Sequence, residues 1–231
     1  MKVINLYESK AGGYFSSARK EILDLMPDFS QRVLEIGCGS GQTLELIKNL
    51  QLCERTVGIE FFEKAAQEAS LRVDETYQLN IETDEFPLGI GQFDLILILD
   101  VLEHLVDPWG ILKLINDSLL KPEGGIIISL PNARHFTCVL PLLFNGEFDY
   151  KERGILDKTH LRFFTRKSGA KMLEQAGLSI QKMKCTSLDW KLNSGKLNAM
   201  TFGVFSEFLT SQYIYLAKKN QVQDQDQGLH R

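Results

Sequence analysis

Three glycines at alternate positions form the part of this sequence whose residue types and spacing best suit ligand binding. Gly37, Gly39 and Gly41 follow an apolar run at residues 33–36, and residues 40–50 have the apolar spacing of a helix. A strand, a glycine turn and a helix N-terminus in succession allow a ligand to lie against bare backbone. The alternative is a tight turn that holds no ligand.

A glutamate at the end of the second apolar run has the chemistry to bind a sugar. Glu60 closes the run at residues 55–60 and lies 19 residues after Gly41 (60 − 41). In a parallel sheet, an acid at this distance is placed to accept hydrogen bonds from a ribose, one hydroxyl on each carboxylate oxygen. The alternative is a solvated surface glutamate.

The glycine spacing separates two classes of nucleotide-binding fold. The dinucleotide fingerprint requires glycine at the first, third and sixth positions, whereas Gln42 occupies the sixth position here. With Glu35 the pattern is E-x-G-x-G-x-G, which resembles motif I of the class I S-adenosylmethionine-dependent methyltransferases. This resemblance implies that S-adenosylmethionine is the cofactor.

Further segments resemble the same family and occur in the same order along the chain. Residues 100–108 are similar to the family segment x-x-L-E-H-x-x-D-P, and Pro131-Asn132 closes a predicted strand. Residues 157–165 resemble a D-x-T-H-x-R-F-F-T segment of methyltransferases from cell-envelope polysaccharide and similar small-molecule pathways. Each segment alone is a weak signal, but the set is specific, and the resemblance covers roughly residues 30–218.

The resemblance assigns cofactor contacts to ten residues. They are Glu35, Gly37, Cys38, Gly39, Gly41, Glu60, Phe61, Asn80, Ile81 and Asp100. Glu35 would orient the turn or bind the methionine ammonium through water. Family members often carry an acid at the position of Asn80 to hold the adenine amino group, and the carbonyl oxygen of Asn80 can still accept that hydrogen bond. Ile81 would cover the adenine ring, with a core isoleucine as the alternative.

Two histidines and an aspartate are the predicted catalytic residues. If the acceptor is a hydroxyl, a base assists removal of its proton, and an unperturbed histidine titrates near ~6.5. His104 is the first prediction and His160 the second, with a structural histidine as the alternative for His104. Asp100 would favour the positive cofactor, and an aspartate could also act as the base. For Asp157, His160 and Arg162, substrate contact and hydrogen-bonded support of the loop are equal alternatives.

These side chains need a sheet whose strands end at one edge. The alternation of strands and helices matches the family's α/β fold, a Rossmann-like, seven-stranded, mostly parallel sheet with helices on both faces and an antiparallel last strand. Strands are predicted at residues 33–36, 55–60, 77–79, 92–99, 126–130, 178–183 and 212–217. Helices are predicted at residues 16–26, 40–50, 62–73, 109–120, 136–144 and 166–176, with a turn at 121–125.

The chain is predicted to form one methyltransferase domain over residues 1–218. Residues 1–31 would form an N-terminal helical preface, and residues 133–165 a lid or substrate insertion. Residues 196–209 are apolar and suit ordinary core, or else a wall of the acceptor pocket or an oligomer surface. The polar tail at 219–231 is expected to be disordered.

Composition limits the partners and the compartment. The 231 residues have a formal net charge of −4, which argues against a nucleic-acid partner. The four cysteines form no C-x-x-C pair and no cluster with histidine, so we expect free thiols, no metal site and a reducing compartment. No apolar run approaches the ~20 residues of a membrane span, and no signal peptide is evident. A cytoplasmic protein is therefore expected, and its oligomeric state is open.

The predicted reaction is methyl transfer to a small-molecule acceptor of sugar or lipid type, at oxygen. Two alternatives remain open. A nicotinamide-dependent oxidoreductase is disfavoured by Gln42, and a non-catalytic cofactor-binding partner subunit is disfavoured by the intact predicted bases.

Overall fold

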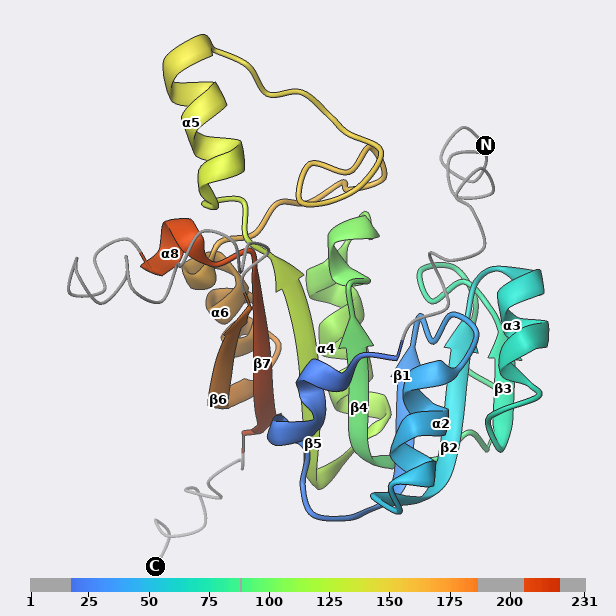
Figure 1. Ribbon diagram of the computed structural model, residues 1–231. Helices are drawn as coiled ribbons and strands as arrows, with labels where there is room; N and C mark the ends of the chain where they lie inside the picture. The colour runs from blue at the N-terminus through green and yellow to red at the C-terminus, as the bar shows by residue number, and fades with distance from the viewer. Residues whose placement is uncertain (1–17, 88, 187–205, 221–231) are drawn as a thin grey trace, which may run out of the picture.

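The computed structural model describes residues 18–87, 89–186 and 206–220, which contain one sheet of seven strands. The strands are β1 (Ser30–Ile36), β2 (Cys53–Glu60), β3 (Glu75–Gln78), β4 (Phe93–Leu99), β5 (Leu120–Pro131), β6 (Leu178–Thr186) and β7 (Gln212–Lys219). Their order is β3-β2-β1-β4-β5-β7-β6 (Figure 1). Neighbouring strands from β3 to β5 pair in parallel, and β7 runs antiparallel to both β5 and β6. This topology confirms the predicted fold class.

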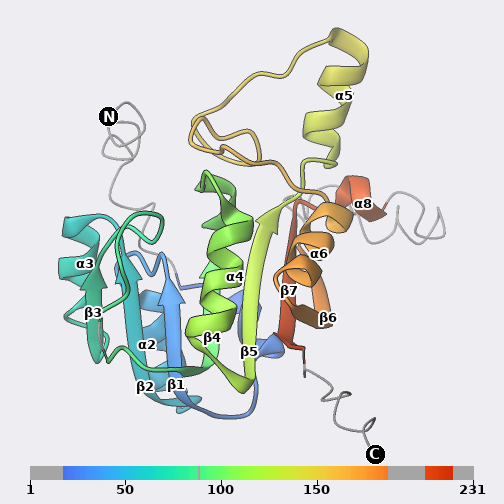
Figure 2. The same cartoon turned by 180° about the vertical axis from the view of Figure 1, so that it is seen from behind.

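Helices cover both faces of the sheet (Figures 1 and 2). They are η1 (Lys20–Leu25), α2 (Gln42–Asn49), α3 (Glu63–Ala69), η2 (Leu102–His104), α4 (Pro108–Ser118), α5 (Phe136–Asn145), α6 (Arg166–Gln175) and α8 (Ser206–Leu209). Successive residues of a strand point to opposite faces. Accordingly, Leu34 packs in one core cluster with Leu112 of α4, whereas Val33 packs in the other with Ile47 of α2.

Local sequence signals determine where α4 begins, directly after the segment at residues 100–107. Asp107 is the N-cap of α4, and its side chain accepts a hydrogen bond from the Gly110 amide at 3.0 Å. Pro108 occupies the first helical turn, where its missing N–H costs nothing. The cap and the proline therefore set where the chain turns after β4, as the sequence predicted.

The last long helix also begins and ends as predicted. Thr165 and Ser168 form a reciprocal capping box at the start of α6. Gly177 follows the helix with φ of +81°, the left-handed conformation that glycine adopts without strain. The polypeptide then turns directly into β6.

Several predicted boundaries differ from the structure, and three of the differences have a clear physical reason. The predicted helix at 16–26 is, within the described residues, a six-residue 3₁₀ helix, whose buried Ile22 and Leu25 lie three residues apart as that geometry requires. The predicted turn at 121–125 belongs to β5, because a register shift between Phe93 and Leu95 absorbs the extra residues as a bulge. The predicted disordered tail starts too early, since Lys219 is part of β7.

Residues 133–165 extend beyond the edge where the parallel strands end. Figure 1 shows α5 and the irregular segment after it standing above that edge. The Phe144 side chain near the end of α5 is 74% exposed. The assignment of this region as a lid or substrate insertion stays a prediction, and most of residues 196–209 lie outside the described residues. Among the described residues, no helix has the length and hydropathy that a membrane crossing requires.

Candidate active site

A cavity of about 510 Å³ lies at the ends of β1, β2 and β4. This volume is within the range of small-molecule sites in proteins. It is lined by nine of the ten predicted cofactor residues: Glu35, Gly37, Cys38, Gly39, Glu60, Phe61, Asn80, Ile81 and Asp100. His104 lines it as well, whereas Gly41 and His160 do not.

The first glycine of the turn keeps the cavity wall free of side chains. Gly37 has φ of +71°, and a Cβ atom placed on it would lie 2.5 Å from Cγ2 of Val101. The amides of Gly37 and Cys38 both donate to the Ile59 carbonyl, at 2.8 and 3.1 Å, so the turn is tied to β2. Bare backbone is thus presented to a ligand at this position.

Gly41 lies where the glycine turn packs against α3. It precedes α2 with φ of +80°, and an added Cβ atom would lie 3.2 Å from Cα of Ala69 in α3. The absence of a side chain therefore permits close packing of α3 against the turn. A cofactor contact of Gly41 remains a prediction.

Glu60 is held rigidly at the end of β2. Its side chain is 4% exposed, and its two oxygens accept hydrogen bonds from the backbone amides of Gly39 (2.8 Å) and Phe62 (2.9 Å). Burial raises the pKa of Glu60, and the two backbone hydrogen bonds oppose that shift. Each oxygen keeps a further lone pair, so the carboxylate can still accept two hydroxyls.

Glu35 is a second buried carboxylate beside the same cavity. Burial raises its pKa to about 8, although Arg19 and a hydrogen bond with Thr43 lower it. Its Oε2 atom has no hydrogen-bond partner among the described residues. A buried, unpartnered carboxylate oxygen at a cavity wall fits a cationic ligand group such as an ammonium.

Asn80 and Ile81 follow β3 at the cavity. The Asn80 Oδ1 atom accepts a hydrogen bond from the Glu82 amide at 3.0 Å, which fixes the amide group in a short turn. Ile81 is buried in a core cluster and also lines the cavity. Ile81 is therefore a core residue, as one interpretation of the sequence has it, and it also faces the cavity. Its contact with the adenine ring stays a prediction.

Asp100 is paired with residues that the sequence did not connect to it. It adopts φ of +56°, and its carboxylate accepts hydrogen bonds from Arg19, from Gln212 and, at 2.7 Å, from Oγ of Ser129. The Arg19 guanidinium balances the Asp100 charge at the cavity. Asp100 is thus placed to hold the N-terminal segment against the sheet, and a catalytic role for it stays a prediction.

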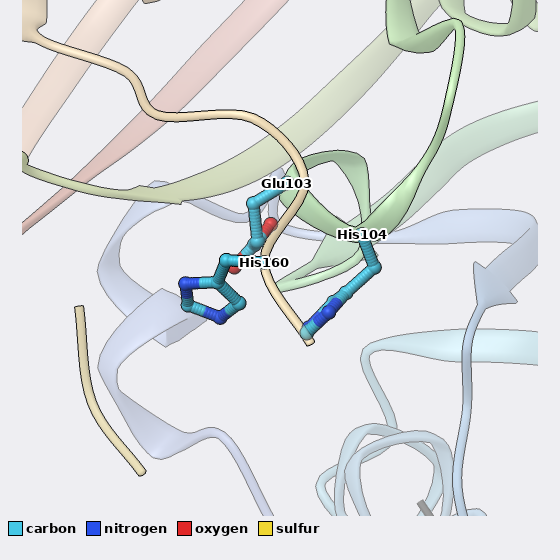
Figure 3. A group of neighbouring side chains, drawn as sticks. All are labelled: Glu103, His104 and His160. Carbon is cyan, nitrogen blue, oxygen red and sulfur yellow. The ribbon is translucent and has the colours of Figure 1, made fainter. Parts of the chain in front are cut away.

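Two histidines and a glutamate converge beside the cavity (Figure 3). One ligand-type atom from each of Glu103, His104 and His160 lies within 4.8 Å of the others. Nδ1 of His104 contacts the Thr159 carbonyl at 3.1 Å, and Nδ1 of His160 contacts the Ile155 carbonyl at 2.9 Å. His160, the second predicted base, thus lies next to His104, the first, with ring centroids 4.7 Å apart.

Glu103 was not anticipated as a functional residue. Its side chain is 1% exposed, and neither carboxylate oxygen has a hydrogen-bond partner among the described residues. Burial raises the pKa of Glu103 well above its usual value, with further contributions from the negative charges of Asp100 and Asp157. The sequence signal for Glu103 is its place in the family segment at residues 100–108, directly before His104.

The loop that carries His160 is clamped onto η2. The Glu103 carbonyl accepts hydrogen bonds from the amides of Leu161 and Arg162, and Nε of Arg162 donates to the Val106 carbonyl at 3.1 Å. Asp157 Oδ1 accepts from both the amide (2.9 Å) and the hydroxyl (2.7 Å) of Thr159. These contacts show that Asp157 and Arg162 support the loop by hydrogen bonds, and substrate contact by either residue stays a prediction.

The class of protein follows from the topology and this cavity. A parallel sheet with an antiparallel β7 between β5 and β6, a glycine turn after β1 and an acid at the end of β2 define the class I S-adenosylmethionine-dependent methyltransferases. The cofactor is S-adenosylmethionine, and the residues present fit it: bare backbone at Gly37, a hydroxyl-accepting Glu60 and an unpartnered oxygen on Glu35.

The chain belongs to the methyltransferase domain family, whose sequence model matches residues 8–182. It is 27% identical over 163 residues to a ubiquinone biosynthesis O-methyltransferase of Acinetobacter baylyi, covering 64% of this chain and 66% of that protein. It is 32% identical over 154 residues to the protein of the same name from Dinoroseobacter shibae, covering 64% and 59%. The matches thus span 66% and 59% of the length of these two relatives.

Solved structures share the fold at low sequence identity. A methyltransferase from Thermotoga maritima, described as a possible histamine N-methyltransferase, superimposes with a TM-score of 0.64 at 18% identity, covering 94% of this chain and 100% of that one. An O-methyltransferase of Brevibacillus brevis in complex with S-adenosyl-L-homocysteine superimposes with a TM-score of 0.54 at 18% identity, covering 83% and 67%. The family match favours methyl transfer over both alternatives.

Proposed function

We propose that the protein transfers the methyl group of S-adenosylmethionine to an oxygen atom of a small-molecule acceptor. The observation that carries the proposal is the single cavity shared by nine predicted cofactor residues and His104. The names of the O-methyltransferase relatives support an oxygen acceptor. We further propose that residues 133–165, which border this edge of the sheet, contact the acceptor (Figure 2).

The cofactor side of the cavity needs little chemistry from the chain. When bound, S-adenosylmethionine supplies a methyl group on a sulfonium, which is already an activated leaving group. Glu60 would accept the ribose hydroxyls, the backbone at Gly37 would permit close approach, and Glu35 would face the methionine ammonium. What remains for the chain is to place the acceptor in line and to exclude water.

The acceptor side has a histidine pair for proton removal. A carbonyl oxygen only accepts hydrogen bonds, so the contact with Thr159 places the proton of the neutral His104 ring on Nδ1. Nε2 then carries the lone pair that can take a proton from an acceptor hydroxyl. The same argument applies to His160 through the Ile155 carbonyl. His104 lines the cavity and is therefore the first residue of the pair to test.

The test is transfer of a tritiated methyl group from S-adenosylmethionine to panels of phenols, quinols, sugars and hydroxylated lipids. We expect a labelled methyl ether, and His104→Gln should lower kcat by about 100-fold or more while cofactor affinity changes little. Lys113→Gln is the control, since Lys113 is an exposed residue of α4 that pairs with Asp117 and does not line the cavity.

Two outcomes would contradict the proposal. An absorbance change on adding a nicotinamide cofactor, without label transfer, would identify an oxidoreductase. Binding of S-adenosylmethionine without any product would favour a non-catalytic partner subunit.

A further inference from the structure

Glu103 is a buried acid that the fold leaves unsatisfied. Its backbone carbonyl is used twice by the loop at 157–162, but both side-chain oxygens lack a hydrogen-bond partner among the described residues. A buried carboxylate without a partner costs several kcal/mol. A catalytic role or a bound ion can account for such a group.

The histidines beside Glu103 are oriented as metal ligands usually are. In metal sites, a ligating imidazole donates its other ring N–H to a carbonyl or carboxylate, which fixes the tautomer and aims the lone pair. His104 and His160 both show this arrangement, with Nδ1 on the carbonyls of Thr159 and Ile155. Their Nε2 atoms are the nitrogens left to carry lone pairs.

The local charge also suits a cation. Asp100 and Asp157 lie close enough to Glu103 to raise the electrostatic cost of its ionised form, and Arg19 opposes them. Arg19 is already paired with Asp100 and Glu21. A divalent ion bound beside Glu103 would favour the ionised form of its carboxyl group.

We propose that Glu103, His104 and His160 form a binding site for one divalent transition-metal ion of the zinc class. Two imidazoles and one carboxylate form a donor set that zinc and its neighbours accept, with a fourth position open to water or substrate. Ligands of one tetrahedral zinc ion lie about 3.3 Å apart, so small side-chain rotations would close the present cluster from within 4.8 Å.

The site would open toward the proposed acceptor, because His104 lines the cavity. The role of the ion in the reaction therefore rests on the proposed O-methyl transfer, which it deepens. An acceptor hydroxyl bound to the ion would lose its proton more readily, and the histidines would then be ligands rather than free bases. The binding site itself can be tested without any turnover.

The test is titration of tag-free, chelator-treated protein with Co²⁺, followed by visible absorption and by equilibrium dialysis with Zn²⁺. We expect one ion per chain and intense d–d bands from a low-coordinate site. Mg²⁺ should compete poorly, since it prefers oxygen ligands. Absence of Co²⁺ and Zn²⁺ uptake by the folded wild-type chain would overturn the proposal.

Variants locate the ion. Glu103→Gln and His160→Ala should each raise the dissociation constant for Co²⁺ at least 10-fold, with folding checked by circular dichroism. His135→Gln and Cys185→Ser are controls, because the former removes a histidine outside the cluster and the latter the exposed thiol. Unchanged uptake in both Glu103 and His160 variants would also overturn the proposal. If one of the two fails to fold, the other decides.

Calorimetry with S-adenosylmethionine separates this inference from the proposed function. Metal uptake without cofactor binding would leave the site standing and remove the methyl-transfer proposal. Cofactor binding and methyl transfer by protein that takes up no metal would do the reverse.

Discussion

Glu60 and Glu35 are buried carboxylates at one cavity, but their oxygens have different partners. Both oxygens of Glu60 are fixed by backbone amides, so its orientation does not depend on a ligand. We expect Glu60→Ala to raise the dissociation constant for S-adenosylmethionine by about 10- to 100-fold, because charge-assisted hydrogen bonds contribute about 1.5–3 kcal/mol. Calorimetry measures this loss. An affinity within twofold of the wild type would show that Glu60 does not hold the ribose.

Glu35 predicts a pH-dependent stability in the absence of cofactor. Its pKa is about 8 in the folded protein, against an ordinary 4.5. Below pH 4.5 both states keep the proton, and as the pH rises toward 8 only the unfolded chain releases it, so folded stability falls across this window. The loss is at most about 1.4 kcal/mol for each unit of the pKa difference. Above pH 8 it is complete.

The measurement is urea denaturation of the wild type and Glu35→Gln at pH 5, 6.5 and 8. Glutamine does not titrate, so the stability of the variant relative to the wild type should increase with pH. Arg19 and Glu60, the other charged groups that act on Glu35, are present in both proteins. A difference that is constant across the three pH values would contradict the assignment.

At the scale of the elements, the turn between β1 and α2 holds a glycine, Gly37, whose surroundings exclude a side chain. Comparison with Gly146 separates that effect from the cost of the left-handed backbone conformation. Gly37 and Gly146 both have φ of +71°, but a Cβ atom would meet Val101 at the first and nothing within 4 Å at the second. Alanine at either position should cost about 1–2 kcal/mol for the left-handed conformation. Gly37→Ala should cost more, and it should also abolish cofactor binding.

Thermal denaturation and calorimetry of Gly37→Ala and Gly146→Ala make this comparison directly. Because both variants carry the same backbone strain, their difference isolates the contact with Val101 and the loss of bare backbone. Equal stabilities together with retained cofactor binding in both would show that the turn tolerates a side chain.

What the sequence could predict at this scale was local. The glycine turn and the starts of α4 and α6 each depend on residues a few positions apart, and all three occur close to the predicted positions. The bulge in β5 was missed because it is set by register against Phe93 on another strand. Arg19 and Glu103 were missed for the same reason, since their partners lie far away in the sequence: Asp100 and Gln212 for Arg19, and the loop at 157–162 for Glu103.

At the scale of the whole molecule, one aspartate joins three parts of the chain. Asp100 directly follows β4, Arg19 precedes η1, and Gln212 begins β7. The Arg19 side chain also donates to Oε1 of Gln212 at 3.2 Å. Arg19 and Asp100 also line the cavity, so we expect this cluster to couple the stability of the N-terminal segment to cofactor binding.

A double-mutant cycle of Arg19→Ala and Asp100→Asn tests that coupling. Either single variant removes the same ion pair from a partly buried site, so the two losses of unfolding free energy should not add, with a coupling of about 1 kcal/mol or more. The pair of Lys184 and Asp24 is the control, since Asp24 is largely exposed and its coupling should be near 0.5 kcal/mol. Cofactor affinity, measured on the same proteins, should fall in Arg19→Ala. Additive stabilities with unchanged affinity would mean that the cluster neither fastens the segment nor shapes the cavity.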